Sequence, residues 1–348
     1  MKIYLAGTTV SNPEKELKIQ SLFREGHKLH SYFHIQPKGF EHGWYGMNTK
    51  NKVDLFLDSG AFSAFTQGVF IDIQEYIAFI RENKGHLSVY ANLDVIGSPE
   101  GTWKNQKIME RAGLNPLPCF HYGEDFKWLR RYLDQGYEYI ALGGMVPIST
   151  PNLLVWLDRV FGNFICDEKG MPKIKVHGFG LTSFGLMLRY PWYSVDSTSW
   201  VVTGRMGSIY VPRFRGGRYV HNEDCWKICV SSRSPSKGDA GQHIDSLSPH
   251  VSKIFLKYIQ EKGYVLGRSS FRIESENYCL QENEKWVGAK KTARDGKREV
   301  EVIEVVGLCN DYKLRDELNI LYFLDLEKEM PEWPRAFQTS QKSGGFGF

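Results

Sequence analysis

Three aspartates each stand directly after a stretch of apolar residues long enough to form a β-strand. Asp58 breaks the run Leu55–Phe65, Asp94 follows the run 87–93, and Asp196 follows a shorter run. Ligands bind at the carboxyl ends of parallel strands, so these positions indicate a shared site. Carboxylates that face one pocket can divide the work, because one can act as a nucleophile while another exchanges a proton with the substrate. Each aspartate taken alone could instead cap a helix or a turn.

Glycines and aromatic rings recur at the same kind of position. A Gly-Gly turn at Gly143–Gly144 and a Gly-Phe-Gly turn at Gly178–Gly180 each follow a predicted strand. Glycine allows backbone N–H groups to come close to a flat ligand. The rings of Phe62 and Phe179 could stack on the faces of such a ligand. The pattern therefore favours a site for a planar, polar molecule.

A regular alternation of strands and helices must position these residues. Strands are predicted at 1–7, 28–35, 55–58, 87–93, 116–121, 137–142, 173–177 and 192–195. Helices are predicted at 15–23, 73–81, 103–112, 126–135, 152–161 and 183–189. Such alternation is typical of a parallel sheet. Because candidate functional residues follow many different strands, we predict an α/β fold of the TIM-type (β/α)8 barrel rather than an open doubly wound sheet.

The alternation stops beyond the last of these strands. A basic insertion at about 201–250 follows, and a helix at 251–263 is expected to return to the barrel, so the catalytic domain is predicted to span 1–265. A small C-terminal α+β extension is predicted at 266–337. Residues 338–348 are rich in glycine and serine and are expected to form a flexible tail.

The composition limits the class of protein. With 348 residues, of which 42% are hydrophobic, the chain can bury a large core. A net charge of +4 excludes a uniformly polycationic nucleic-acid binder, so contact with nucleic acid requires local clusters of charge. The six cysteines lie far apart, and the chain shows neither a signal peptide nor a membrane-spanning run. We therefore expect reduced thiols, a cytoplasmic location and no membrane partner.

Taken in order, the motifs resemble those of the tRNA-guanine transglycosylase superfamily. Asp58–Phe62, with the sequence Asp-Ser-Gly-Ala-Phe, is similar to the family's Asp-Ser-Gly-Gly-aromatic motif. Leu142–Met145 resembles its Gly-Gly-Leu-Ala turn, and His177–Gly180 resembles the histidine-containing strand end that follows. The resemblance covers roughly residues 55–200. It is closest to the phage and bacterial DNA-modifying branch, the DpdA-type 7-deazaguanine DNA transglycosylases.

The resemblance implies a role for each carboxylate. Asp196 would attack the anomeric carbon of a target guanosine, expel guanine and form a covalent glycosyl-enzyme, while Asp58 would act as general acid and base. Asp94 would recognise the guanine-like edge of the base, together with backbone groups of Gly143 and Gly144. Exchange of bases on one face of the sugar requires a double displacement, and hence a carboxylate nucleophile. No redox or nucleotide cofactor is expected.

The expected substrate-binding residues all lie in these motifs or at predicted strand ends. They are Ser59, Phe62, Asp94, His121, Gly143, Gly144, Met145, His177 and Phe179. His121 and His177 could equally be structural residues. A target base must leave its stack to enter such a pocket, where aromatic walls stabilise it.

The chain departs from the family at the zinc site, which in the tRNA enzymes uses three closely spaced cysteines and a histidine. Here Cys225 and Cys229 are four residues apart, with His221 before them and His243 after them. These four side chains could form a different zinc site. Ordinary thiols are the simpler interpretation, so no metal cofactor is expected.

A second departure is the basic stretch Gly204–Val220, in which arginines alternate with aromatic residues and glycines. The residues predicted to contact the phosphate backbone are Arg205, Arg213, Arg215 and Arg218. The rings predicted to lie near sugars or unstacked bases are Tyr210, Phe214 and Tyr219. The alternative interpretation is a solvated loop.

The function predicted from the sequence is that of a transglycosylase that exchanges guanine in DNA for a 7-deazaguanine such as 7-cyano-7-deazaguanine. Its partners would be DNA, in preference to tRNA, and the free 7-deazaguanine base. It would act in the cytoplasm, which for a phage protein is that of the host. The alternatives are the same exchange on tRNA, a barrel N-glycoside hydrolase that releases the base without replacing it, and a catalytically inactive nucleic-acid-binding protein.

Overall fold

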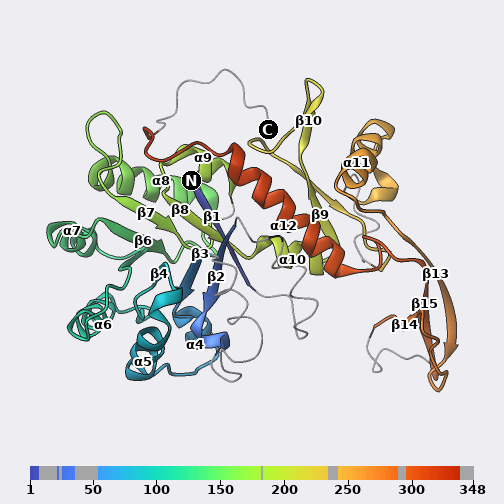
Figure 1. Ribbon diagram of the computed structural model, residues 1–348, viewed down its shortest axis with the longest axis horizontal. Coiled ribbons are helices and arrows are strands. Elements are labelled where there is room, and N and C mark those ends of the chain that lie inside the picture. The colour runs from blue at the N-terminus through green and yellow to red at the C-terminus, as the bar shows by residue number, and fades with distance from the viewer. Residues whose placement is uncertain are drawn as a thin grey trace. The chain divides into compact units, whose positions relative to one another are not determined.

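The computed structural model describes residues 1–7, 22, 26–35, 54–181, 183–233, 242–288 and 295–337 (Figure 1). The chain divides into two compact units. Unit 1 comprises Met1–Thr198 and the chain from Leu326 onward, and unit 2 comprises Ser199–Asp325. The predicted domain boundary at 265 falls within unit 2. The predicted helix at 15–23 and the predicted tail at 338–348 lie outside the described residues, except for Leu22.

Unit 1 is built on an eight-stranded sheet. Its strands are β1 (Lys2–Ala6), β2 (His27–Ser31), β3 (Asp54–Asp58), β4 (Val89–Tyr90), β5 (Cys119–His121), β6 (Tyr139–Gly143), β7 (Lys175–Gly178) and β8 (Ser194–Ser197). They are ordered β4-β3-β2-β1-β8-β7-β6-β5 across the sheet, and the neighbouring strands pair in parallel. The predicted α/β class and the parallel sheet are confirmed.

The two edge strands of this sheet are joined to each other. A parallel bridge connects Ala91, just after β4, with Leu117, just before β5. The N–H of Asn92 donates to the carbonyl of Leu117 at 2.9 Å, and the N–H of Leu117 donates to the carbonyl of Tyr90 at 2.8 Å. The sheet therefore curls round on itself, which is consistent with a (β/α)8-like fold.

Helices follow most of the strands and lie along the outside of the sheet (Figure 1). They are α2 (Tyr32–Ile35), α4 (Ala61–Thr66), α5 (Ile73–Asn83), α6 (Pro99–Arg111), α7 (Phe126–Asp134), α8 (Thr150–Val160) and α9 (Phe184–Arg189). A 3₁₀ turn at Lys84–His86 follows α5, and a π-helical turn at Phe161–Ile165 follows α8. Asp72, Ser98 and Asp125 cap α5, α6 and α7 by accepting hydrogen bonds from first-turn N–H groups.

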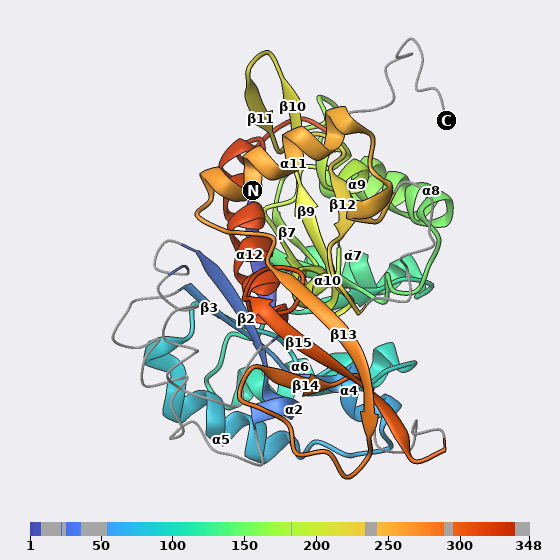
Figure 2. The same cartoon turned by 90° about the vertical axis from the view of Figure 1, so that its right-hand side faces the viewer.

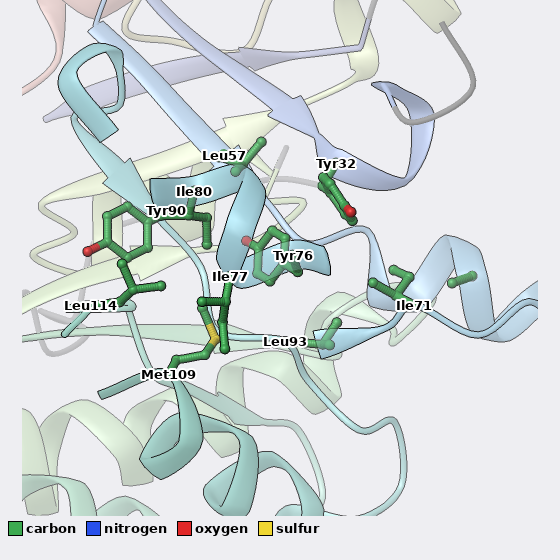
Figure 3. Packing of buried hydrophobic residues seen from close by; sticks show 11 residues of the cluster. Tyr32, Leu57, Ile71, Tyr76, Ile77, Ile80, Tyr90, Leu93, Met109 and Leu114 are labelled. Carbon is green, nitrogen blue, oxygen red and sulfur yellow. The ribbon is translucent and has the colours of Figure 1, made fainter. Parts of the chain in front are cut away.

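Alternate residues of each strand point to opposite faces of the sheet, which produces two cores. One face carries a cluster drawn from several strands, including Tyr4, Phe56 and Cys119. On the other face, Leu57 of β3 packs with Ile77 of α5 and other residues of the cluster (Figure 3). Leu57 is fully buried, and burying a side chain of this size contributes about 1.5–3 kcal/mol. The second core fixes the helices to the sheet, while the first supports the strand ends.

Unit 2 begins with α10 (Ser199–Arg205) and contains antiparallel sheets of two or three strands (Figure 2). The strands are β9 (Ser208–Val211), β10 (Arg213–Arg215), β11 (Arg218–Val220), β12 (Trp226–Cys229), β13 (Arg268–Ser275), β14 (Glu284–Trp286) and β15 (Lys297–Val305). The helical elements are a 3₁₀ turn at Ile244–Ser246, α11 (Pro249–Glu261) and α12 (Tyr312–Glu329). The described helices of both units include none that is long and apolar enough to cross a membrane.

Candidate active site

The carboxyl ends of several strands of unit 1 surround a pocket of about 680 Å³. This volume lies within the range of enzyme and ligand sites. The predicted site residues that line it are Asp58, Ser59, Phe62, Asp94, His121, Gly143, Gly144, Met145 and Phe179. The structure therefore brings together residues from distant parts of the sequence, at the end of the sheet where the strand–helix pattern places them.

Asp58 ends β3 and lies on the pocket wall. Its Oδ2 accepts a hydrogen bond from the N–H of Gly60 at 3.0 Å. Burial and the neighbouring carboxylates of Asp196 and Asp94 raise the pKa of Asp58 to about 7, although the N–H groups of Gly60 and Ser59 oppose the shift. Asp58 can therefore both hold and release a proton near neutral pH, as a general acid and base must.

Gly60 forms the turn that holds Asp58 in this position. Its φ of 77° lies in the left-handed region, where residues with a Cβ are strained. A Cβ at this position would lie 2.4 Å from both Phe33 Cβ and Ser31 Oγ. The turn after β3 consequently requires glycine for two independent reasons, its conformation and the close approach of the chain that follows β2.

Gly60→Ala is expected to destabilise the protein by about 2–5 kcal/mol, which is the sum of left-handed strain and overpacking. Gly68→Ala is the matched control, because Gly68 has a φ of 65° but no atom within 4 Å of an added Cβ. That variant should lose only about 1–2 kcal/mol. Urea denaturation monitored by circular dichroism measures both values. Equal losses in the two variants would show that the close contact at Gly60 has no energetic effect.

Asp196 lies at the end of β8 and is largely buried, with 9% of its side chain exposed. Its Oδ1 accepts a hydrogen bond from the N–H of Gly180 at 2.8 Å. Asp196 is not among the residues that line the pocket, but Gly180 is. In the β1–β8 register Asp196 pairs with Tyr4. Tyr4 belongs to the cluster that includes Phe56 and Cys119, so the side chain of Asp196 points to the same face of the sheet as that cluster.

His177 is fully buried behind the pocket wall rather than in it. Its Nε2 lies 3.4 Å from Oδ1 of Asp196, and its Nδ1 lies 2.8 Å from Oγ of Ser194. Burial lowers the pKa of His177 although Asp196 opposes the shift, so the ring is neutral at pH 7. His177, predicted to bind the substrate, does not line the pocket. Its imidazole lies against the Asp196 carboxylate instead.

Asp94 and His121 form a polar cluster at another part of the pocket. Oδ2 of Asp94 lies 3.2 Å from Nε2 of His121, and Oε1 of Glu124 lies 3.2 Å from Nδ1. Burial disfavours a charge on His121, but Cys119 and Asp94 outweigh burial and raise its pKa. Sequence reasoning missed both Cys119 and Glu124. The Cys-x-His spacing could have indicated the first, because alternate strand residues share a face.

The two aromatic side chains predicted to hold a base differ in their surroundings. Phe62 lines the pocket and is 59% exposed, so its ring is accessible to a ligand. Phe179 also lines the pocket, but its ring packs against His177, with centroids 4.6 Å apart, and against Phe56. Phe179 therefore lines the pocket and also packs against the cluster that includes Tyr4, Phe56 and Cys119.

Three of the predicted nucleic-acid contacts lie on the β10–β11 hairpin of unit 2. Arg215 pairs with Arg218 in the hairpin register, so these two side chains share a face with Arg213. Arg213 stacks on Trp226 at 4.3 Å, Arg215 lies 2.8 Å from Glu223, and Arg218 is exposed. Arg205 is also exposed, at the end of α10.

The aromatic residues of this stretch, predicted to lie near sugars or unstacked bases, are not on the arginine face of the hairpin. Phe214 and Tyr219 pair on the opposite face of the hairpin, with ring centroids 5.0 Å apart. Tyr219 also packs against Tyr258 of α11, and Tyr210 stacks on Tyr322 of α12. These rings therefore contribute to packing within unit 2, and the arginines form the polar face.

The four residues considered for a rebuilt zinc site do not gather around a common point. His221 lies 3.9 Å from Asp325, and Nδ1 of His243 lies 3.2 Å from Asp245. Across the described ranges, the His, Cys, Asp and Glu side chains form one cluster with metal-binding spacing, and it consists of Asp94, Cys119 and His121. A metal site in unit 1, rather than in unit 2, is thus compatible with the fold.

The pocket is lined by Asp58, whose pKa is raised to about 7, and by the accessible aromatic ring of Phe62. A second carboxylate, Asp196, accepts a hydrogen bond from the backbone N–H of Gly180 in the pocket wall. This combination suits nucleophilic and acid–base chemistry at a glycosidic carbon. The chain matches no model of a known protein family, no curated protein and no solved structure.

Proposed function

We propose that the protein is a transglycosylase that replaces guanine in DNA with a 7-deazaguanine base. The observation that carries the proposal is that Asp58 and Asp94 line one pocket while Asp196 is hydrogen-bonded to Gly180 of its wall. Burial, together with the charges of Asp196 and Asp94, raises the pKa of Asp58 to about 7. A general acid and base needs a carboxyl group with a raised pKa, which Asp58 has, and a nucleophile needs a carboxylate in a fixed position, which the hydrogen bond from Gly180 gives to Asp196.

In the first step, the Asp196 carboxylate attacks the anomeric carbon of the target nucleotide. The bond between that carbon and the base breaks, its electron pair goes to the base, and Asp58 supplies the proton that makes free guanine. The hydrogen bond from Gly180 holds the attacking carboxylate in place, and the imidazole of His177 lies 3.4 Å from the same oxygen. The sugar remains attached to Asp196 as an ester.

In the second step, the incoming base reverses these events. Asp58, now ionised, takes the proton from the ring nitrogen of the 7-deazaguanine, and that nitrogen attacks the anomeric carbon. The ester bond to Asp196 breaks and the carboxylate is restored. Two displacements on the same carbon retain its configuration, as replacement of one base by another in an intact strand requires.

The remaining pocket residues suit a flat, polar base. Asp94 and His121 provide polar groups for its edge, and the backbone at Gly143 and Gly144 borders the same pocket. The exposed ring of Phe62 provides a stacking surface. A base that has left its stack could be held by these contacts.

A nucleic acid is the partner we favour because arginines share one face of the β10–β11 hairpin, and the resemblance of the motifs to the DNA-modifying branch favours DNA over tRNA. The double variant Arg215→Gln/Arg218→Gln is expected to weaken DNA binding and to reduce the slope of log affinity against log salt by about 1.5, because each lost phosphate contact removes about 0.7–0.9. Fluorescence anisotropy at several salt concentrations measures the slope. The control Lys104→Gln/Lys169→Gln makes the same change in net charge at exposed positions of unit 1. An equal effect in both variants would contradict a specific role for the hairpin.

The proposed reaction is tested by base exchange. Purified protein is incubated with radiolabelled 7-cyano-7-deazaguanine and with duplex DNA, single-stranded DNA or tRNA in separate reactions. Label is expected to enter DNA, with release of guanine. Label in tRNA alone would assign the polymer to tRNA, and guanine release without incorporation of label would identify a hydrolase. An absence of both release and incorporation would contradict the proposal.

A further inference from the structure

The side chains of Asp94, Cys119 and His121 have the spacing of metal ligands. One donor atom from each lies within 4.8 Å of the other two. Oδ2 of Asp94 is 3.2 Å and Sγ of Cys119 is 3.5 Å from Nε2 of His121. In a tetrahedral zinc site with ordinary bond lengths, a nitrogen lies about 3.3 Å from an oxygen ligand and about 3.5 Å from a sulfur ligand. Both separations from the imidazole therefore match those of zinc coordination.

The fold explains why these three residues meet. Cys119 and His121 are alternate residues of β5, so they point to the same face of the sheet. Asp94 follows β4, which the bridge between Ala91 and Leu117 joins to the β5 side of the sheet. The site therefore depends on the contact between the two edge strands.

Gly143 lies close to two of the donor atoms. It pairs with His121 in the β5–β6 register. A Cβ at this position would lie 2.9 Å from Sγ of Cys119 and 3.1 Å from Nε2 of His121. A side chain at 143 would therefore collide with the sulfur and the imidazole, so the present arrangement of Cys119 and His121 requires glycine at this position.

Glu124 gives His121 the orientation of a metal ligand. Its Oε1 lies 3.2 Å from Nδ1 of His121, and its Oε2 accepts the backbone N–H of the same residue at 3.1 Å. Histidines that bind metal through one ring nitrogen commonly donate the other N–H to a carboxylate. Oδ1 of Asp94 is buried and has no hydrogen-bond partner among the described residues, so this oxygen is available to bind an ion.

We propose that Asp94, Cys119 and His121 bind one divalent transition-metal ion, with zinc preferred. A thiolate, an imidazole and a carboxylate form a donor set that selects zinc over magnesium or calcium. Asp94 and His121 line the pocket, so the fourth coordination position faces it and is open to water or to a ligand heteroatom. The site does not depend on the proposed reaction. In a transglycosylase, the ion rather than Asp94 itself would face the edge of the base.

The experiment measures metal binding without reference to activity. Chelator-washed protein is titrated with Zn²⁺ in competition with a chromophoric chelator, and separately with Co²⁺, whose thiolate complexes absorb in the near ultraviolet. One equivalent of each ion should bind, with a sulfur-to-cobalt band. Cys119→Ser should abolish this band. Glu124→Gln, which leaves the ligands in place, should weaken zinc binding by about 10–100-fold.

Two cysteine variants locate the ion. Cys166→Ser alters a buried cysteine of unit 1 outside the cluster and should retain full binding and the cobalt band. Cys229→Ser should also retain them, whereas loss of the ion in this variant would place it in unit 2 and overturn the proposal. Circular dichroism verifies that each variant is folded. The proposal would also be overturned if the wild type bound zinc no more tightly than the double variant Cys119→Ser/His121→Asn. The imidazole of His121 would then serve to connect the carboxylates of Asp94 and Glu124 by hydrogen bonds.

Discussion

Asp196→Asn is expected to lower the rate of base exchange by about 10⁴-fold or more, because a carboxamide cannot form the glycosyl ester. The protein should stay folded. Asparagine has nearly the same shape and keeps an oxygen that can accept the hydrogen bond from Gly180, which Asp196 receives at 2.8 Å. The rate of guanine release under single-turnover conditions is the measurement, since it isolates the first displacement.

The control for this variant is Asp134→Asn, which makes the same chemical change at an exposed position of α7. It should exchange bases at the wild-type rate. If Asp196→Asn kept more than a tenth of the activity, Asp196 could not be the nucleophile. An attack by water or by the incoming base itself would then be required.

Asp58→Asn is expected to slow guanine release by about 10²–10⁴-fold, the usual effect of removing a general acid. In the wild type the same step should slow by about tenfold per pH unit above pH 7, because Asp58 has a pKa of about 7 and its protonated form supplies the proton. The profile is measured on chelator-washed protein, so that no cation near Asp94 alters the field at Asp58. A first step that is independent of pH between 6 and 9 would contradict this role.

The same substitution should also change stability, in the opposite direction to activity. Burial raises the pKa of Asp58 from 3.8 to about 7, so between these values the folded protein holds a proton that the unfolded chain releases. Stability therefore falls as the pH rises through this range. Asp58→Asn removes the cost of ionising the buried group and should stabilise the protein at pH 8 by on the order of 4 kcal/mol. The gain should vanish near pH 4, which urea denaturation at the two pH values would reveal.

Much of unit 1 could be predicted from the sequence because its pattern is local. Most strands lie in short runs rich in apolar residues that end at a glycine or a polar residue, and α5, α6 and α7 begin at side chains that cap them. The order of strands across the sheet follows from parallel pairing of successive units. For the same reason, the strand ends that carry Asp58 and Asp94 could be expected to meet at one pocket.

The parts that could not be predicted depend on contacts between distant residues. That His177 lies beneath Asp196 follows from the β7–β8 pairing and from complete burial, neither of which the sequence around His177 reveals. The proximity of Cys119 to Asp94 requires the bridge between Ala91 and Leu117. In unit 2 the strands are antiparallel, and Tyr210 and Tyr219 pack against helices of the same unit. The alternation of arginine with aromatic residues therefore does not reveal which side chains lie at the surface.

The most direct test of the account is to trap the sugar on Asp196. The protein is incubated with a guanine-containing DNA oligonucleotide in the absence of any incoming base, denatured, and analysed by intact mass spectrometry and peptide mapping. We predict a covalent protein–DNA adduct on the peptide that contains Asp196, formed as guanine is released and absent from Asp196→Asn. Addition of 7-cyano-7-deazaguanine before denaturation should remove the adduct and leave modified DNA. Guanine release without an adduct on this peptide, under conditions where exchange proceeds, would contradict the double displacement and the assignment of Asp196.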